Sequence, residues 1–255
     1  MRAKSCDITA IVNFHAEGIY AEAAIRSFDR MCRCAQEEGL LVERMAVLDR
    51  ADALTARIIQ DASAVFDAIE VVDFGDLGDA RNHGIRRATG KYVALFDGDD
   101  MWGRSWLHRA HHEVSRSKKD VIAHPEWMYY FCDEDFARTS LYEKPASGSR
   151  SFFMRHIGSK SPRFDVAAIM FNNVYSSNSF ARRNLLLNFP YLKVDRMKGL
   201  GVEDWYWNAM TLRHGIEHLA VPESVHVIRV KSSASSLGVR NAASGLLPPL
   251  FNLYA

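Results

Sequence analysis

Residues 91–100 have the sequence Lys-Tyr-Val-Ala-Leu-Phe-Asp-Gly-Asp-Asp. The apolar run at 92–96 is typical of a buried β-strand. Carboxylates follow it directly, and ligands of open α/β sheets bind at the carboxyl ends of the strands. Carboxylates this close repel one another unless a cation neutralises them, and oxygen ligands suit Mg²⁺ or Mn²⁺, which also bind phosphates. The stretch indicates either a metal-assisted nucleotide site or an acidic turn that caps the next helix.

The composition places the chain among ordinary globular proteins. Its 255 residues carry a formal net charge of +1, which does not favour nucleic-acid binding. No apolar run approaches the roughly 18 residues of a membrane span, and the N-terminal residues lack the apolar segment of a signal peptide. The 4 cysteines do not resemble a disulfide framework. We therefore expect a cytoplasmic protein with reduced thiols.

Strand and helix patterns alternate through residue 124. Strands are expected at residues 8–12, 40–48, 68–72, 92–96 and 120–124, and helices at 17–38, 54–65, 79–89 and 104–117. This alternation predicts a parallel, doubly wound sheet. Residues 1–124 are therefore expected to be the nucleotide-binding half.

The regular alternation of strand and helix patterns ends after residue 124. The patterns there predict a hairpin or edge strand at 126–131, a long loop at 144–163, a strand-like segment at 169–180, a helix at 203–214 and a strand at 224–230. The tail from 232 to 255 is rich in Ser, Ala and Gly, and we expect it to be mobile. No repeat or linker is found, so a single domain over 1–255 is predicted.

An ordered set of segments, at 11–15, 47–52, 78–102 and 201–215, resembles the family 2 glycosyltransferases of the GT-A fold. Those enzymes typically have an Ala-Arg-Asn-x-Gly-Ile helix, then Ala-x-Gly, an apolar strand and an Asp-x-Asp-Asp turn. The stretch 80–100 has this order, and Glu-Asp-Trp at 203–205 with a later Gly is a second match. The resemblance covers roughly residues 7–231.

The resemblance implies a GT-A fold: a mostly parallel sheet flanked by helices, with an acceptor-side extension. It implies a metal-dependent, inverting transfer of a sugar from a nucleotide-sugar, with a UDP-sugar favoured, to a hydroxyl acceptor. The acceptor would be a carbohydrate or a lipid-linked molecule of polysaccharide or glycoconjugate synthesis, with peripheral membrane contact left open. Residues 1–124 would bind the donor, and residues 125–231 would shape the acceptor site.

The resemblance also assigns roles to the acidic residues. Asp49 would contact the nucleobase, although a helix N-cap is the alternative. Asp97 would contact the ribose, and Asp99 would bind the Mn²⁺ or Mg²⁺ that bridges the diphosphate. Asp204 would be the general base, with a helix cap again as the alternative. Asp100 would cap the following helix or help to bind the metal.

Several further residues receive roles by the same comparison. Arg81 and Asn82 would bind the donor. His226 would be a late metal ligand or an ordinary strand residue, and Arg229 or Lys231 could neutralise the diphosphate instead. Glu203 would position the acceptor or favour the helix dipole.

The chain also departs from the family pattern. Leu48 replaces the first carboxylate of the usual Asp-Asp-Gly-Ser, which leaves the nucleobase open, and Asn13 replaces a common Pro. Two rival functions remain: a catalytically silent GT-A binding module and a sugar-phosphate nucleotidylyltransferase. Residues 13–18 lack the Gly- and Arg-rich loop that the second rival usually has.

Overall fold

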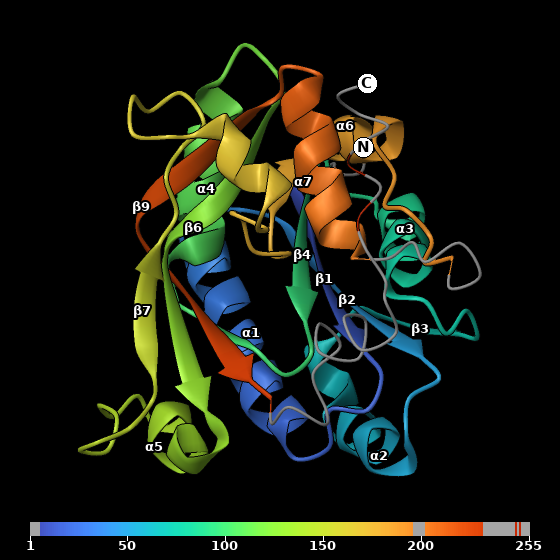
Figure 1. Cartoon of the computed structure of the whole chain (residues 1–255). Helices are drawn as coiled ribbons and strands as arrows, with labels where there is room; N and C mark the ends of the chain where they lie inside the picture. Colours follow the sequence, from blue (N-terminus) through green and yellow to red (C-terminus); the bar gives the residue numbers. More distant parts are fainter. Residues whose placement is uncertain (1–5, 196–201, 232–247, 249, 251–255) are drawn as a thin grey trace.

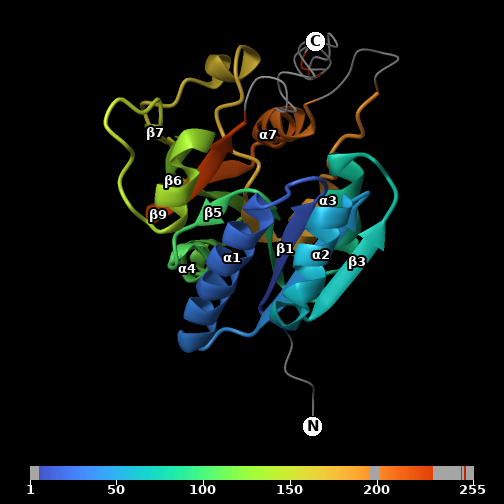
Figure 2. The same ribbon diagram turned by 90° about the horizontal axis from the view of Figure 1, so that it is seen from below.

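A computed structural model describes residues 6–195, 202–231, 248 and 250. Over these residues a single mixed sheet, with helices on both faces, forms the centre of the molecule (Figure 1). The sheet has 9 strands in the described part of the chain, and the strand order along it is β3-β2-β1-β4-β8-β6-β9-β5, with β7 paired to β6. Figure 2 shows β3 and β7 on opposite sides of the molecule.

The first half of the sheet is parallel, as the alternation predicts. Its strands are β1 (Ile8–Phe14), β2 (Val42–Asp49), β3 (Ala68–Val72) and β4 (Tyr92–Asp97). The connecting helices are α1 (Tyr20–Glu37), α2 (Ala53–Asp61) and α3 (Leu77–Arg87). A short 3₁₀ helix, η1 (Ser63–Val65), follows α2. Because parallel strands end on the same edge, Asp49 and Asp97 share one edge of the sheet.

The second half contains longer and mixed strands. They are β5 (Met101–Trp102), β6 (Val121–Cys132), β7 (Phe152–Arg155), β8 (Phe180–Arg182) and β9 (Glu217–Val230). The helices of this half are α4 (Trp106–Arg116), η2 (Asp133–Asp135), α5 (Phe136–Ser140), η3 (Val166–Met170), α6 (Arg183–Asn188) and α7 (Glu203–Arg213). β6 and β9 are parallel partners, whereas β5, β7 and β8 run antiparallel to their partners.

Apolar side chains pack on both faces of the sheet. One core joins the sheet to α1, α2 and α4, and includes Phe28, Ile59 and Trp106. The other joins it to α3, α6 and α7, and includes Ile85 and Trp207. Burial on both faces explains why the strand before the acidic turn is continuously apolar rather than alternating.

The predicted α/β class is confirmed, but several predictions for the second half are wrong. The strands expected at 120–124 and 126–131 are one strand, β6, which lies inside the sheet and not at its edge. Pro125 has no N–H to donate to a neighbouring strand. A bulge between Pro125 and Trp127 accommodates this gap in the hydrogen bonding, so the strand continues past it. The predicted loop at 144–163 contains β7, and the segment 169–180 is mostly irregular.

Other sequence predictions concern the chain ends and the membrane. The predicted strand at 224–230 begins earlier, at Glu217. The predicted mobile tail at 232–255 lies outside the described residues, apart from 248 and 250. In the described part of the chain, no helix is both long and apolar enough to cross a bilayer.

Candidate active site

The acidic turn lies at the carboxyl end of β4 and packs directly on the end of β1. The Gly98 N–H donates to the Asn13 carbonyl at 2.9 Å. A Cβ at Gly98 would collide with the Phe14 ring and with that carbonyl. The turn therefore requires glycine between its first two carboxylates.

Arg81 of α3 joins the two acidic motifs of the sequence. Its guanidinium donates at 2.8 Å to Asp97 through Nη2 and at 2.8 Å to Glu203 through Nη1. The Arg81 side chain is 2% exposed, so this bridge is buried. Burial alone would raise the pKa of Asp97, but Arg81 and the Ser177 hydroxyl outweigh it and lower that pKa. Asp97 is thus held as a carboxylate in one orientation.

Asp99 has cationic partners from the end of β9. Lys231 Nζ lies 2.9 Å and Arg229 Nη1 3.5 Å from Asp99 Oδ2. Burial and the neighbouring Asp100 raise the pKa of Asp99. Burial would lower the pKa of Lys231, but Asp99 outweighs it and raises that pKa, so Lys231 carries a charge. The structure thus brings together the residues that the sequence offered as diphosphate-neutralising groups.

Asp100 does not cap a helix, so that interpretation is wrong. Its Oδ2 lies 2.7 Å from His226 Nε2, and its Oδ1 accepts the backbone N–H of Arg229 at 2.9 Å. His226 is 1% exposed, contacts Asn178 Nδ2 at 2.8 Å and stacks on Trp102. These contacts fasten β9 to the acidic turn.

The carboxylates can be tested as ligands for the divalent cation that the family implies. In the described part of the chain, no group of three His, Cys, Asp or Glu side chains could hold a metal ion by itself. Mg²⁺ in nucleotide enzymes is usually bound by one or two carboxylates together with substrate phosphates. Asp99, buried at 6% exposure and lining the cavity, fits that donor set. The metal role of His226 stays a prediction. A metal ion there would compete with the contacts that the ring already makes with Asp100 and Asn178.

Asp204 lies in the first turn of α7, as the sequence predicted. Its Oδ2 accepts from the Asn173 side chain at 3.0 Å, and its Oδ1 accepts the backbone N–H of Trp205 at 2.8 Å. Burial raises the pKa of Asp204. Burial and the charge of Asp204 also raise the pKa of Glu203 to about 7, although Arg81 opposes that shift. A partly buried carboxylate with a raised pKa is a better proton acceptor near neutral pH.

Asp49 and Asn82 both hold backbone segments in place. The Asp49 carboxylate accepts the N–H groups of Phe74, Gly75 and Asp76 at 2.8 to 3.0 Å. The alternative N-cap role belongs to Asp52, which accepts from Thr55 N. Both ends of the Asn82 amide bond the backbone of Tyr191. The donor-binding roles of Asp49 and Asn82 stay predictions.

One cavity of about 830 Å³ brings the two motifs together. Its lining includes Asp97, Asp99, Asp100, Asp204 and His226, but Arg81, Asn82 and Asp49 do not line it. Residues 172–177 of the irregular segment also line it. The sequence analysis missed Asn173 and Ser177, which bond Asp204 and Asp97. The polar sequence Asn-Asn-Val-Tyr-Ser-Ser-Asn at 172–178 could have revealed them, because it lacks the alternation of a strand.

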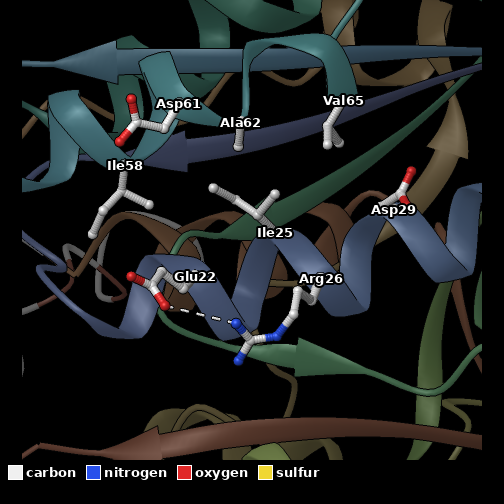
Figure 3. Close-up of a pocket in the computed structure, with 8 residues that line it drawn as sticks. All are labelled: Glu22, Ile25, Arg26, Asp29, Ile58, Asp61, Ala62 and Val65. Carbon is white, nitrogen blue, oxygen red and sulfur yellow. Dashed lines mark ion pairs between the residues drawn. The ribbon is translucent and has the colours of Figure 1, made fainter.

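A smaller hollow of about 370 Å³ lies between α1 and α2 (Figure 3). Its charged side chains include Glu22 and Arg26, which pair at 3.7 Å. Asp29, also in its wall, pairs with Arg33 and Arg44. None of the carboxylates of the acidic turn lines this hollow. We therefore place the candidate active site in the larger cavity.

Solved structures with the same fold were found by comparison. TarS residues 1–349 from S. aureus, in complex with UDP-GlcNAc, superimposes with a TM-score of 0.61 at 15% identity, covering 89% of this chain and 59% of that one. The mannosyltransferase PcManGT from Pyrobaculum calidifontis, in complex with GDP-Man and Mn²⁺, superimposes with a TM-score of 0.59 at 16% identity. The match covers 88% of this chain and 57% of that one. At such identities the likeness establishes the GT-A fold alone, and this chain spans less than two thirds of each structure's length.

The sequence comparisons differ in outcome. No curated protein sequence matches the chain. The family model described as glycosyl transferase family 2 matches residues 16–183, which include the acidic turn, Arg81 and Ser177. This match spans more than half of the 255 residues. The chain therefore belongs to glycosyl transferase family 2.

Proposed function

We propose that this protein transfers a sugar from a nucleoside diphosphate sugar to an acceptor hydroxyl, with inversion at the anomeric carbon. The observation that carries the proposal is the single cavity lined by Asp97, Asp99 and Asp204. Two solved structures with this fold contain UDP-GlcNAc and GDP-Man, and both ligands are nucleoside diphosphate sugars. A UDP-sugar remains our favoured donor, and Asp49 our candidate contact for its base.

The donor end of the cavity supplies charge for the leaving group. Lys231 and Arg229 carry cationic groups beside Asp99, where diphosphate oxygens would arrive. Asp99 would also hold Mn²⁺ or Mg²⁺ together with the diphosphate, and this ion would supply Lewis-acid stabilisation of the departing charge. Asp97 is fixed by Arg81 and by Ser177, and its side chain is 23% exposed, so its oxygens would accept ribose hydroxyls from the cavity as further partners. These contacts would orient the anomeric carbon toward the acceptor half.

The acceptor end supplies the base. Asp204 takes the proton of the acceptor hydroxyl as its oxygen attacks the anomeric carbon. A carbon–oxygen bond to the acceptor forms while the bond to the diphosphate breaks, so a single displacement inverts the configuration. Asn173, which donates to Asp204 Oδ2, would keep the carboxylate turned toward the cavity. We still propose that residues 1–124 bind the donor and that residues 125–231 shape the acceptor site.

The variant Asp204→Asn tests this assignment. The amide keeps the shape of the side chain but loses its basicity, so the rate of transfer should fall by roughly a hundredfold or more. Affinity for UDP with Mn²⁺, measured by calorimetry, should barely change, because the base serves the acceptor. Asp165→Asn is the matched control, since Asp165 lines the same cavity but caps η3.

Two results would contradict the proposal. Transfer at nearly the native rate by Asp204→Asn would show that Asp204 is not the general base. A product that keeps the donor's anomeric configuration would exclude a single displacement. If the native protein binds UDP but turns over no donor, it is a binding module instead.

A further inference from the structure

Asn208 is a buried polar side chain that has no role in the mechanism described so far. It lies on α7 four residues after Asp204, so the two side chains project from the same face of the helix. Asn208 is 1% exposed and does not line the cavity, whereas Asp204 does. Any effect of Asn208 on a ligand in the cavity must therefore pass through a neighbouring residue.

That neighbour is Asn173. The side-chain Nδ2 of Asn208 donates to Asn173 Oδ1 at 2.9 Å and to the Tyr175 carbonyl at 3.2 Å. Asn173 Nδ2 donates in turn to Asp204 Oδ2 at 3.0 Å. The two amides thus form a chain of hydrogen bonds that leaves α7 at Asn208, crosses to Asn173 and returns to the same helix at Asp204.

The direction of this chain is set by a group that cannot turn. A side-chain amide can present either its oxygen or its NH₂ group to a neighbour. The Tyr175 carbonyl is a backbone acceptor, so Asn208 must present its NH₂ group there, and the second hydrogen of that group meets Asn173. Asn173 then accepts with its oxygen, and its own NH₂ group faces Asp204. A donor at this position favours the carboxylate form of Asp204.

Packing alone does not explain an amide at position 208. Asn208 Oδ1 has no hydrogen-bond partner within the described part of the chain, and a buried amide oxygen without a partner destabilises the fold. A leucine has a similar shape and would avoid that cost. The NH₂ group is thus the part of Asn208 that the structure uses, and both of its hydrogens serve residues 173–175.

We propose that Asn208 is a positioning residue for the general base, because it orients the Asn173 amide so that Asp204 stays charged and turned toward the cavity. The inference rests on the proposed function, since it requires Asp204 to be the base. A base must be unprotonated before it can accept the proton of the acceptor hydroxyl. Without Asn208, the Asn173 amide would be free to turn its oxygen toward Asp204 and to stabilise the protonated form instead.

Other groups act on the protonation of Asp204. Burial raises its pKa, Arg81 opposes that shift, and Asp97 adds to it. The titratable groups that interact with Asp204 come from several elements: Glu203 of α7, Arg81 of α3, Asp97 of β4, Tyr130 of β6, and Tyr191. All of them are kept in the variants below, so these variants compare Asp204 with and without the oriented amide.

An NMR titration of the Asp204 carboxyl carbon tests the proposal, and Asp204→Asn assigns its resonance. In the native protein, the side-chain amide signals of Asn173 and Asn208 should shift at the same pH as that carbon. Asn208→Leu removes the donor, so Asp204 should titrate at a higher pH. A midpoint higher by one pH unit would reduce the charged fraction of Asp204, and with it the transfer rate, about tenfold at any pH well below the midpoint. Affinity for UDP with Mn²⁺, measured by calorimetry, should barely change.

Thr211→Val is the matched control on the same helix. Thr211 is 0% exposed, and its hydroxyl lies 2.9 Å from His218 Nε2 and within 3.0 Å of the carbonyl oxygens of Trp207 and Asn208. This change also removes a buried polar group at nearly constant shape, but it leaves the amide chain intact. Asp204 should therefore titrate as it does in the native protein.

Three results would overturn the proposal. The first is an unchanged titration of Asp204 in Asn208→Leu, and the second is an equal shift in Thr211→Val. The third needs no variant and decides the matter if Asn208→Leu does not fold: Asn208 amide signals in the native protein that do not follow the titration of Asp204.

The failure of this inference can be separated from the failure of the proposed function. An Asp204 titration that ignores Asn208 contradicts only the positioning role. Transfer at nearly the native rate by Asp204→Asn contradicts the base itself, whatever the titration shows.

Discussion

The cavity has two ends that differ in their side chains: the proposed donor end at the acidic turn, and the proposed acceptor end around Asp204 and β7. At the donor end each carboxylate of the acidic turn has a partner: Asp97 has Arg81, Asp99 has Lys231, and Asp100 has His226. At the acceptor end the side chains are mostly apolar, and those of β7 lie partly open to solvent. One end is a buried network of charges, and the other combines an apolar strand surface with Asp204 and its partner Asn173.

This difference predicts how each end responds to change. A buried charge network must be complete, because removing one member leaves the others charged in a medium of low dielectric constant. An apolar surface loses free energy in proportion to the area removed, so substitutions there have graded effects. The structure therefore suits a donor end that resists variation and an acceptor end that can be altered in small steps.

The strongest test of the comparison is Arg81→Met, which leaves Asp97 and Glu203 without their shared cation. Because both carboxylates are largely buried, we expect a loss of about 3 to 5 kcal/mol in the free energy of unfolding. Urea denaturation measures it. Arg87→Met on the same helix is the control: Arg87 is 61% exposed, and its pair with Glu70 should contribute less than about 1 kcal/mol. Equal losses in the two variants would refute the distinction between the buried network and surface charge.

A second test asks whether the proposed acceptor end depends on a buried polar residue next to β7. His156 follows β7; its Nδ1 donates to the Pro125 carbonyl at 2.5 Å, and its Nε2 accepts from Ser176 N at 3.0 Å. Burial lowers the pKa of His156 to about 4, from an ordinary value of 6.5. The unfolded chain therefore binds more protons than the folded one below pH 6.5, and stability contributed by this residue falls as pH decreases toward 4.

Between pH 6.5 and 5 this residue should cost the protein about 2 kcal/mol of stability. His156→Gln keeps one donor and one acceptor but cannot titrate, so the same pH change should destabilise it by about that much less. Urea denaturation at the two pH values gives the difference. If the variant and the native protein lose stability equally, His156 is not held neutral by burial.

The smallest expected effect concerns the metal ion that we propose at Asp99. Asp99→Ala should remove the part of UDP affinity that Mn²⁺ provides, a change on the order of tenfold, because Asp99 is the proposed metal carboxylate. Lys231→Met is its matched comparison, since it removes the other partner of the same ion pair and should keep the Mn²⁺ dependence. Calorimetry with and without Mn²⁺ measures both. Unchanged Mn²⁺ dependence in Asp99→Ala would show that the ion is held elsewhere.

Local sequence was sufficient for residues 1–124. Apolar runs followed by Asp49 and Asp97 predicted strands whose carboxyl ends share one edge, and the structure confirms that arrangement. Each of these strands is buried on both faces and flanked by helical patterns, so the period of the apolar residues is enough to identify it. The motif order likewise predicted the family, which the family model confirms.

The structure of residues 125–231 depended on pairings between distant residues. The sequence at 144–163 gives little sign of β7, because a four-residue strand forms there only by pairing with β6. The contact of Asp100 with His226 joins residues 126 positions apart, and that of Arg81 with Glu203 joins residues 122 apart. The sequence by itself thus determined the α/β class, the family and the chemical types at the strand ends. Only the tertiary structure decided which cation meets which carboxylate and which strands pair beside the cavity, because those choices depend on strand order and register, which local propensity does not encode.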